Sequence, residues 1–202
     1  MVTGTAPAGT LDHDKIRRGV RLLIEGMGDD PDRAGVRATP ERVARMFDEV
    51  YGGLHIDPRD VVDVMFEEGH DELVLVRDIP LASMCEHHMV PFVGRAHVGY
   101  IPNTRGQVTG LSKLARLVEV VSRRPSLQER MTTIIADTLE EVLEPRGVLV
   151  IIEAEHLCMT MRGVRKPGST TVTSAVRGRM RDDPRTRSEA MALATGRPLG
   201  AR

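Results

Sequence analysis

GLSKLARLVEVVSRRPSLQERMTTIIADTLEEVL, residues 110–143, contains two helical patterns, one directly after the other. Each carries apolar side chains at the spacing of one helix face. Ser112 is a residue type that caps helix N-termini, so we expect it to be the N-cap of the first helix. Pro125 ends that helix, and the second helix is expected over residues 126–143.

Strand patterns flank this helical pair on both sides. They are rich in Val and Thr and cover residues 61–66, 72–79, 92–101, 148–156, 157–162 and 170–177. Further helices are expected over residues 12–27, from an N-cap at Thr39 to Val50, and after Asp183. Two adjacent helices between groups of strands indicate an α+β fold with antiparallel strands, rather than alternating βα units.

Composition places the chain among ordinary globular proteins. It has 202 residues, of which 41% are hydrophobic and 28% charged. The net charge of −1 and an aromatic content of 2% argue against a nucleic-acid partner, which favours basic and stacking side chains. No apolar run is long enough for a membrane span. The N-terminus shows no secretory signal pattern, so we expect a cytoplasmic protein.

The run Cys85-Glu86-His87-His88 predicts a metal site. Cys85 and His88 have C-x-x-H spacing, which lets two side chains bind one ion from a tight loop. Cys158 is the expected third ligand, and thiolate with imidazole favours zinc. Three protein ligands leave one coordination position for water, whose pKa zinc lowers to about 7.

Two other interpretations of these residues remain open. The site is structural if His87 or His156 supplies a fourth ligand, and the two cysteines are otherwise simply buried. A histidine that lies near the metal without binding it can instead transfer protons, because its pKa is close to neutral. The spare histidines on both sides favour a catalytic site.

Basic residues at helix starts suggest an anion site. Lys113 and Arg116 lie in the first turn after Ser112, where free N–H groups already favour an anion. Arg42 and Arg45 have the same spacing on an earlier helix. The alternative for each pair is a solvated charged face. The chain has no Walker-type phosphate loop.

Further candidate residues lie near the second helix and the second cysteine. Gln128 and Glu129 begin the helix at residues 126–143, and a carboxylate there can accept the N1–H and 2-amino hydrogen bonds of guanine. The alternative is an acid that merely favours a helix N-terminus. Arg162 follows Cys158 and is a further candidate cation.

Several long stretches together resemble the GTP cyclohydrolase I family. They are TPERVARMF, VRDIPLASMCEHHMVPFVGRAHVGYIP, GLSKLARLVE, SRRPSLQER, EAEHLCMTMRG, TVTSAVRG and RDDPRTR, in the family's order over roughly residues 15–190. The resemblance implies a tunnelling fold and an allosteric homodecamer of two pentamers with active sites between subunits. It divides the chain into a disordered tail (1–10), a helical region (11–60) and the tunnelling-fold catalytic domain (61–202).

The resemblance also implies the reaction and the role of each residue. The expected activity is the conversion of GTP to 7,8-dihydroneopterin triphosphate and formate, the first step of pterin and tetrahydrofolate biosynthesis. The zinc ligands would be Cys85, His88 and Cys158, and the proton-transfer pair His87 and His156. The substrate contacts would be Glu129 and Gln128 on guanine, Ser112 near the ribose, Lys113, Arg116 and Arg162 on the triphosphate, and Arg42 and Arg45 from an adjoining subunit.

Two rival functions are weighed against this one. Another tunnelling-fold enzyme, such as a nitrile reductase acting on a deazaguanine, would use a cysteine as nucleophile and need no metal. A zinc-stabilised assembly protein would show a closed site with four ligands. The Cys-Glu-His-His run with a separate His-x-Cys argues against the first, and the set of phosphate and guanine residues argues against the second.

Overall fold

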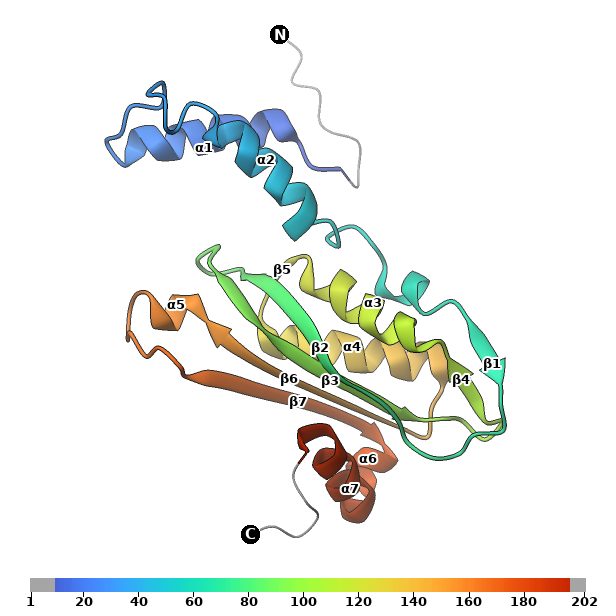
Figure 1. Cartoon of the computed structure of the whole chain (residues 1–202). Helices are drawn as coiled ribbons and strands as arrows, with labels where there is room; N and C mark the ends of the chain where they lie inside the picture. The colour runs from blue at the N-terminus through green and yellow to red at the C-terminus, as the bar shows by residue number, and fades with distance from the viewer. Residues whose placement is uncertain (1–9, 197–202) are drawn as a thin grey trace.

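The computed structural model describes residues 10–196 and is built on one five-stranded sheet (Figure 1). The strand order is β5-β2-β3-β6-β7. The bounds are β2 Val74–Cys85, β3 Pro91–Ile101, β5 Pro125–Ser126, β6 Gly147–His156 and β7 Thr170–Gly178. All neighbours are antiparallel except the short parallel pair of β2 and β5. The tail expected at residues 1–10 lies, apart from Thr10, outside the described residues.

The apolar strand expected at residues 148–156 lies inside the sheet as β6. Successive side chains of a strand point to opposite faces, so its continuous apolar run fills two cores. Val148, Val150 and Ile152 pack into the main core with the long helices. Leu149 and Ile151 pack into a second core with residues of the C-terminal helices. Both faces of β6 are therefore covered.

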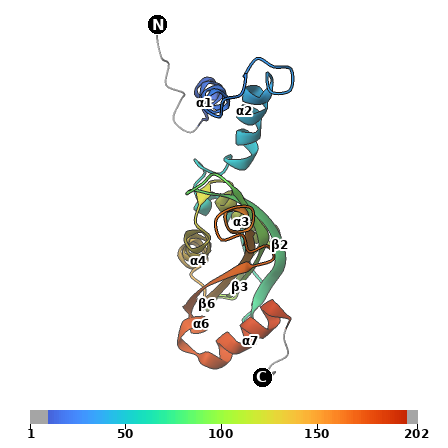
Figure 2. The ribbon, with the colours of Figure 1, turned by 90° about the vertical axis from the view of Figure 1, so that its left-hand side faces the viewer.

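Two adjacent helices cover one face of the sheet, as the sequence predicted (Figure 2). They are α3 Leu111–Ser122 and α4 Gln128–Leu143. The other face is partly covered by α6 Arg179–Asp182 and α7 Pro184–Thr195. Asp183 caps α7 by accepting from the N–H of Arg185. No helix among residues 10–196 is long and apolar enough to cross a membrane.

The N-terminal helices form an arm that stands apart from the sheet (Figures 1 and 2). They are α1 His13–Gly26 and α2 Thr39–Val50, close to the ranges expected from the sequence. Arg17 of α1 donates to Glu41 of α2 at 2.6 Å, and His13 lies 2.8 Å from Asp48. The two helices are thus held to each other more than to the rest of the chain.

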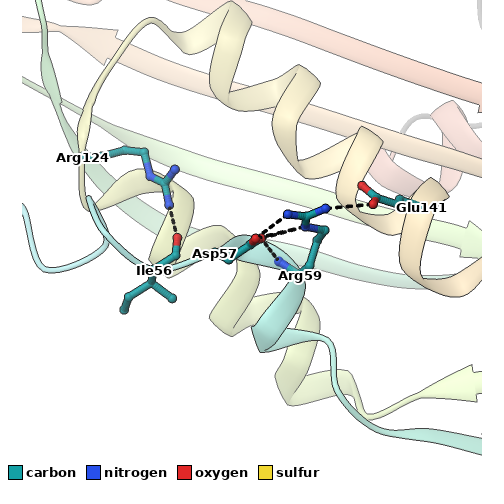
Figure 3. A network of polar contacts seen from close by, with 5 residues as sticks. All are labelled: Ile56, Asp57, Arg59, Arg124 and Glu141. Carbon is teal, nitrogen blue, oxygen red and sulfur yellow. Dashed lines mark hydrogen bonds and ion pairs between the residues drawn. The ribbon is translucent and has the colours of Figure 1, made fainter. Parts of the chain in front are cut away.

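A network of arginines fixes the linker between this arm and the sheet (Figure 3). Arg59 lies in the 3₁₀ helix η1, Pro58–Val61, and binds both Asp57 and Glu141 of α4. The hydrogen bonds from Arg59 lower the pKa of Asp57 to about 2. Arg124, which follows α3, donates to the carbonyl oxygens of Gly53 and Ile56. Burial lowers the pKa of Arg124.

Both expected N-caps are wrong. The N-cap of α3 is Gly110, whose extended backbone lets the helix begin before Ser112, and Ser112 is exposed in the first turn. The N-cap of α2 is Ala38, which already has a helical backbone, so Thr39 is the first helical residue. Neither cap makes a side-chain hydrogen bond.

The strand expected at residues 157–162 is also wrong. That segment begins with the short helix α5, Leu157–Thr160. The chain must reverse direction between β6 and its antiparallel neighbour β7, and the turn of α5 starts that reversal. Strand preference is easily overridden by such context.

The strands before α3 differ from the expected ranges in length. The range 61–66 begins at the last residue of η1 and ends within β1, Met65–Glu67. β1 pairs with β4, Gln107–Thr109, a strand that the sequence pattern did not predict. The range 72–79 continues as β2 to Cys85, with a shift of register between Val76 and Ile79. The longer β2 ends at Cys85, one of the candidate site residues.

Replacing Gly94 by Ala tests the close contact between β3 and β6. An added Cβ would lie 1.9 Å from the carbonyl oxygen of Glu153 and 2.7 Å from the Cα of Ala154. Since both atoms belong to the backbone, we expect the free energy of unfolding to fall by roughly 1–3 kcal/mol. Thermal unfolding measures the loss. Gly19→Ala is the control, because nothing lies within 4 Å of its added Cβ. Equal melting temperatures of Gly94→Ala and the wild type would refute the prediction.

Candidate metal centre and substrate site

Cys85, His88 and Cys158 come together where β2 ends and β3 begins. Their ligand atoms all lie within 4.8 Å of one another. Cys85 ends β2, His88 lies in the turn before β3, and Cys158 is in α5. Cys85 is buried, Cys158 half-buried and His88 exposed. The three residues predicted to bind one ion are therefore close enough to share one.

A tight turn positions two of these residues. The N–H of Cys85 donates to the carbonyl oxygen of Val90, and the N–H of Met89 donates to that of Cys85. Met89 has a φ of +52°, which closes the turn. On the other side, Cys85 pairs with Ser126 of β5, and the N–H of Glu86 donates to the carbonyl oxygen of Ser126. The turn is thereby attached to the segment that leads into α4.

The donor set fits a zinc ion. Two sulfurs and one imidazole are the ligands that zinc favours. Burial raises the pKa of the Cys158 thiol, and the neighbouring Cys85 raises it further. The Cys158 thiol is therefore a poor anion by itself, and a divalent cation bound here would stabilise its thiolate form. Neither His87 nor His156 joins the three-residue group among the described residues.

The two spare histidines differ in their surroundings. His87 is exposed, with its ring 6.3 Å from that of His88. His156 ends β6, and its ring stacks on Phe92 at a centroid distance of 4.6 Å. Its Nε2 lies 2.7 Å from Oε1 of Gln128. Burial lowers the pKa of His156, and the charge of Glu129 acts in the opposite direction.

The start of α4 lies beside the metal ligands. Gln128 is buried, with its side chain bound to His156 and to neighbouring strands, whereas Glu129 is exposed. Arg130 binds Glu86 through two hydrogen bonds of 2.6 and 3.1 Å, which lower the pKa of Glu86. Arg162, after α5, donates to Nε2 of His88 at 3.0 Å.

The other predicted substrate residues lie elsewhere in the chain. Ser112, Lys113 and Arg116 begin α3, whose opposite end leads to β5 and the metal ligands. Lys113 is therefore about two and a half helical turns, roughly 14 Å, from that end. It is paired with Asp63, whose pKa it lowers. Arg42 and Arg45 are exposed on the arm. A single chain does not bring these residues to the metal ligands.

Two contacts in this region were not predicted from the sequence. Phe92 is opposite His156 in the pairing of β3 with β6, which places the two rings on one face. The ion pair of Glu86 with Arg130 joins the ligand turn to α4. The position of Glu86 within the Cys-Glu-His-His run was the only sequence signal for the second contact, and no signal pointed to Phe92.

Comparison with known proteins assigns the family. The sequence model described as GTP cyclohydrolase I matches residues 16–195. The chain belongs to the GTP cyclohydrolase I family. A protein named GTP cyclohydrolase 1 from Thermobifida fusca is 61% identical over 96% of this chain and 93% of its own length. One of the same name from Streptomyces avermitilis is 59% identical over 96% of both.

Other organisms have proteins of the same name that are similar to this chain. A GTP cyclohydrolase 1 from Carboxydothermus hydrogenoformans is 61% identical over 91% of this chain and 95% of its own. Among solved structures, the archaeosine synthase QueF-Like in its apo form overlaps with a TM-score of 0.41 at 17% identity. The overlap covers 52% of this chain and 93% of that one. The family match and the names of the curated relatives favour GTP cyclohydrolase I over the nitrile reductase and the assembly protein considered above.

Replacing Arg130 by Ala tests whether the ion pair with Glu86 holds the ligand turn. We expect the zinc affinity of this family member to fall ~10-fold, the lower end of the effect of residues that orient metal ligands. Dialysis against a competing chelator, followed by metal analysis, measures it. Arg123→Ala is the matched control, because it removes a similar surface pair with Glu119 on α3. Equal zinc retention by the two variants would show that the Glu86 contact does not position the ligands.

Proposed function

We propose that this protein is a zinc-dependent GTP cyclohydrolase I. It converts GTP and water to 7,8-dihydroneopterin triphosphate and formate, the first step of pterin and tetrahydrofolate biosynthesis. The observation that carries the proposal is the Cys85, His88 and Cys158 group beside His156 and Glu129, in a chain of this family. A metal site next to a histidine and an exposed carboxylate suits hydrolysis of a purine ring.

The metal ligands and histidines carry the hydrolytic part of the proposal. Cys85, His88 and Cys158 would hold the zinc ion, which would lower the pKa of a water molecule to about 7 and so make a nucleophile available for C8 of guanine. His156 donates a proton to N7, which becomes basic when C8 is attacked. His87, exposed near His88, carries protons as the ring opens and formate leaves. Glu129 accepts hydrogen bonds from N1–H and the 2-amino group of guanine.

The basic residues hold the rest of the substrate. Lys113, Arg116 and Arg162 bind the triphosphate, Ser112 assists at the ribose, and Arg42 and Arg45 reach the phosphates from an adjoining copy. Binding at the start of α3 uses the free N–H groups of a helix N-terminus together with these cations. Asp63 is then exchanged for phosphate as the partner of Lys113.

Several copies of the chain are needed to complete this site. The start of α3 and the arm lie away from the metal ligands, so we propose that they serve the metal centre of another copy. The free edge of β7 supports this assembly, since an unpaired strand edge favours pairing with another chain. The arrangement we propose is the tunnelling fold, as a toroidal decamer of two pentamers. Allosteric control remains a prediction.

We place the protein in the cytoplasm. Cys85 and Cys158 must stay reduced to bind zinc, and a reducing compartment keeps thiols in that state.

Incubation with GTP tests the reaction directly. We expect formate and, after oxidation, a fluorescent pterin in equal amounts, because each ring that opens releases one formate and is rebuilt as one pterin. Removal of zinc by a chelator should abolish both products, and added zinc should restore them. Formate and pterin are measured enzymatically and by fluorescence. Turnover that persists in metal-free protein would contradict a zinc-dependent reaction.

Mixing two inactive variants tests whether sites are shared between copies. Glu129→Gln removes the guanine anchor and Lys113→Ala a phosphate ligand, and each should lose most of its turnover. If a site takes these two residues from different copies, subunit exchange in a 1:1 mixture restores roughly a quarter of the wild-type sites. The control is the same mixture without exchange. No recovery after exchange, shown to be complete by mass spectrometry, would mean that both residues serve one site from the same chain.

A further inference from the structure

The side chain of Gln128 uses all of its hydrogen-bonding atoms inside the protein. It is 1% exposed at the first residue of α4. Its Nε2 donates to the carbonyl oxygens of Ile152 and Thr171 at 2.9 and 3.0 Å, and lies 3.1 Å from Oγ1 of Thr173. Its Oε1 lies 2.7 Å from Nε2 of His156. This amide therefore connects α4, β6, β7 and a histidine at the candidate site.

Only one orientation of this amide satisfies its neighbours. Backbone carbonyl oxygens only accept hydrogen bonds, so the atom facing Ile152 and Thr171 must be the nitrogen. A rotated amide would place its oxygen against these two carbonyl oxygens, and none of the three could donate a hydrogen to another. The orientation thus follows from chemistry.

Two hydroxyl groups complete the network in a consistent direction. Thr132 donates from Oγ1 to the backbone oxygen of Gln128 at 2.7 Å, which uses its single hydrogen. Thr173 Oγ1 lies 2.6 Å from Thr132 Oγ1, so Thr173 is the donor in that contact. The oxygen of Thr173 is then available to accept from Gln128.

This network determines which nitrogen of His156 carries hydrogen. Since Oε1 of Gln128 can only accept, Nε2 of His156 must donate. In the neutral ring Nδ1 then has no hydrogen. No hydrogen bond from Nδ1 joins it to a described residue, and the His156 side chain is half-buried. The stacked ring of Phe92 restricts rotation of the imidazole out of this position.

We propose that Gln128 is a positioning residue that fixes His156 in the Nε2–H tautomer, so that Nδ1 is the atom that exchanges protons with the substrate. The substrate part rests on the proposed function. With its Nε2–H held by Gln128, the neutral ring keeps one tautomer and needs no rearrangement between turnovers. Gln128 acts through His156, and Glu129 alone of the pair contacts guanine.

Nuclear magnetic resonance of the zinc-loaded protein, labelled with ¹⁵N-histidine, tests the tautomer without substrate. Two-bond ¹H–¹⁵N correlations distinguish the two neutral forms, and His156→Asn identifies the signals by their loss. We expect the Nε2–H form in the wild type and in Thr173→Val, which alters the network but keeps the amide. Gln128→Leu should give a mixture of tautomers, as should Gln128→Asn, whose shorter side chain withdraws the oxygen. A wild-type ring in the Nδ1–H form would overturn the proposal even if no variant folds.

Steady-state kinetics separate positioning from substrate contact. A wrong tautomer weakens proton transfer, so kcat of Gln128→Leu should fall at least ~10-fold while KM for GTP and zinc content stay near wild-type values. Thr173→Val should keep most of the wild-type kcat. A raised KM with unchanged kcat would show that Gln128 binds guanine, and would overturn the proposal. If the wild type releases no formate from GTP, the proposed function fails, whereas the resonance measurement still decides the tautomer.

Discussion

The register of β2, β3 and β6 is the constraint on which the candidate site depends. Antiparallel pairing of these three strands brings the end of β2, the start of β3 and the end of β6 to the same end of the sheet. Cys85, Phe92 and His156 are placed by that alignment alone, and Cys158 follows two residues after His156. A slip of one residue between β3 and β6 would turn His156 to the opposite face and separate it from Phe92. The close contact at Gly94, within the same pairing, is one reason that such a slip is disfavoured.

The first turn of α4 connects this end of the sheet to the helical layer. Its first three residues make different contacts. Gln128 points into the protein and binds His156, Glu129 is exposed, and Arg130 binds Glu86 in the ligand turn. Consecutive residues of a helix point in directions about 100° apart, so three neighbours can serve three surroundings. The short parallel pair of β5 with β2 fixes where this turn begins. The metal ligands and the start of α4 therefore form one connected structure, although more than 30 residues of chain separate Cys85 from Gln128.

The sequence predicted most of the elements and the grouping of Cys85, His88 and Cys158, for identifiable reasons. Helical periodicity in residues 110–143 and the apolar run of β6 are strong patterns that packing did not override. The three ligands were predicted because the Cys-Glu-His-His run and His-x-Cys are themselves informative. Local patterns failed at α5, where the reversal of the chain decides the conformation, and at the caps, where backbone geometry replaced a side chain. The surroundings of Gln128 depend on acceptors from β6 and β7, which no pattern within α4 contains.

The predicted phosphate-binding residues at the start of α3 and on the arm lie away from the candidate metal ligands of the same chain. Within one chain, α3 ends just before β5 and α4 begins just after it. The start of α4 therefore lies near the candidate metal ligands, while the start of α3 lies a helix length away from them. A helix N-terminus attracts an anion only within its first turn. A phosphate bound at the start of α3 therefore lies too far from the candidate metal ligands of the same chain to share one substrate with them. In the assembly that we propose, the chain is repeated around an axis, so each copy would offer its α3 to one neighbour and receive that of the next. The arm that stands apart from the sheet, and the edge of β7 that pairs with no strand among residues 10–196, would be available to neighbouring copies in that assembly.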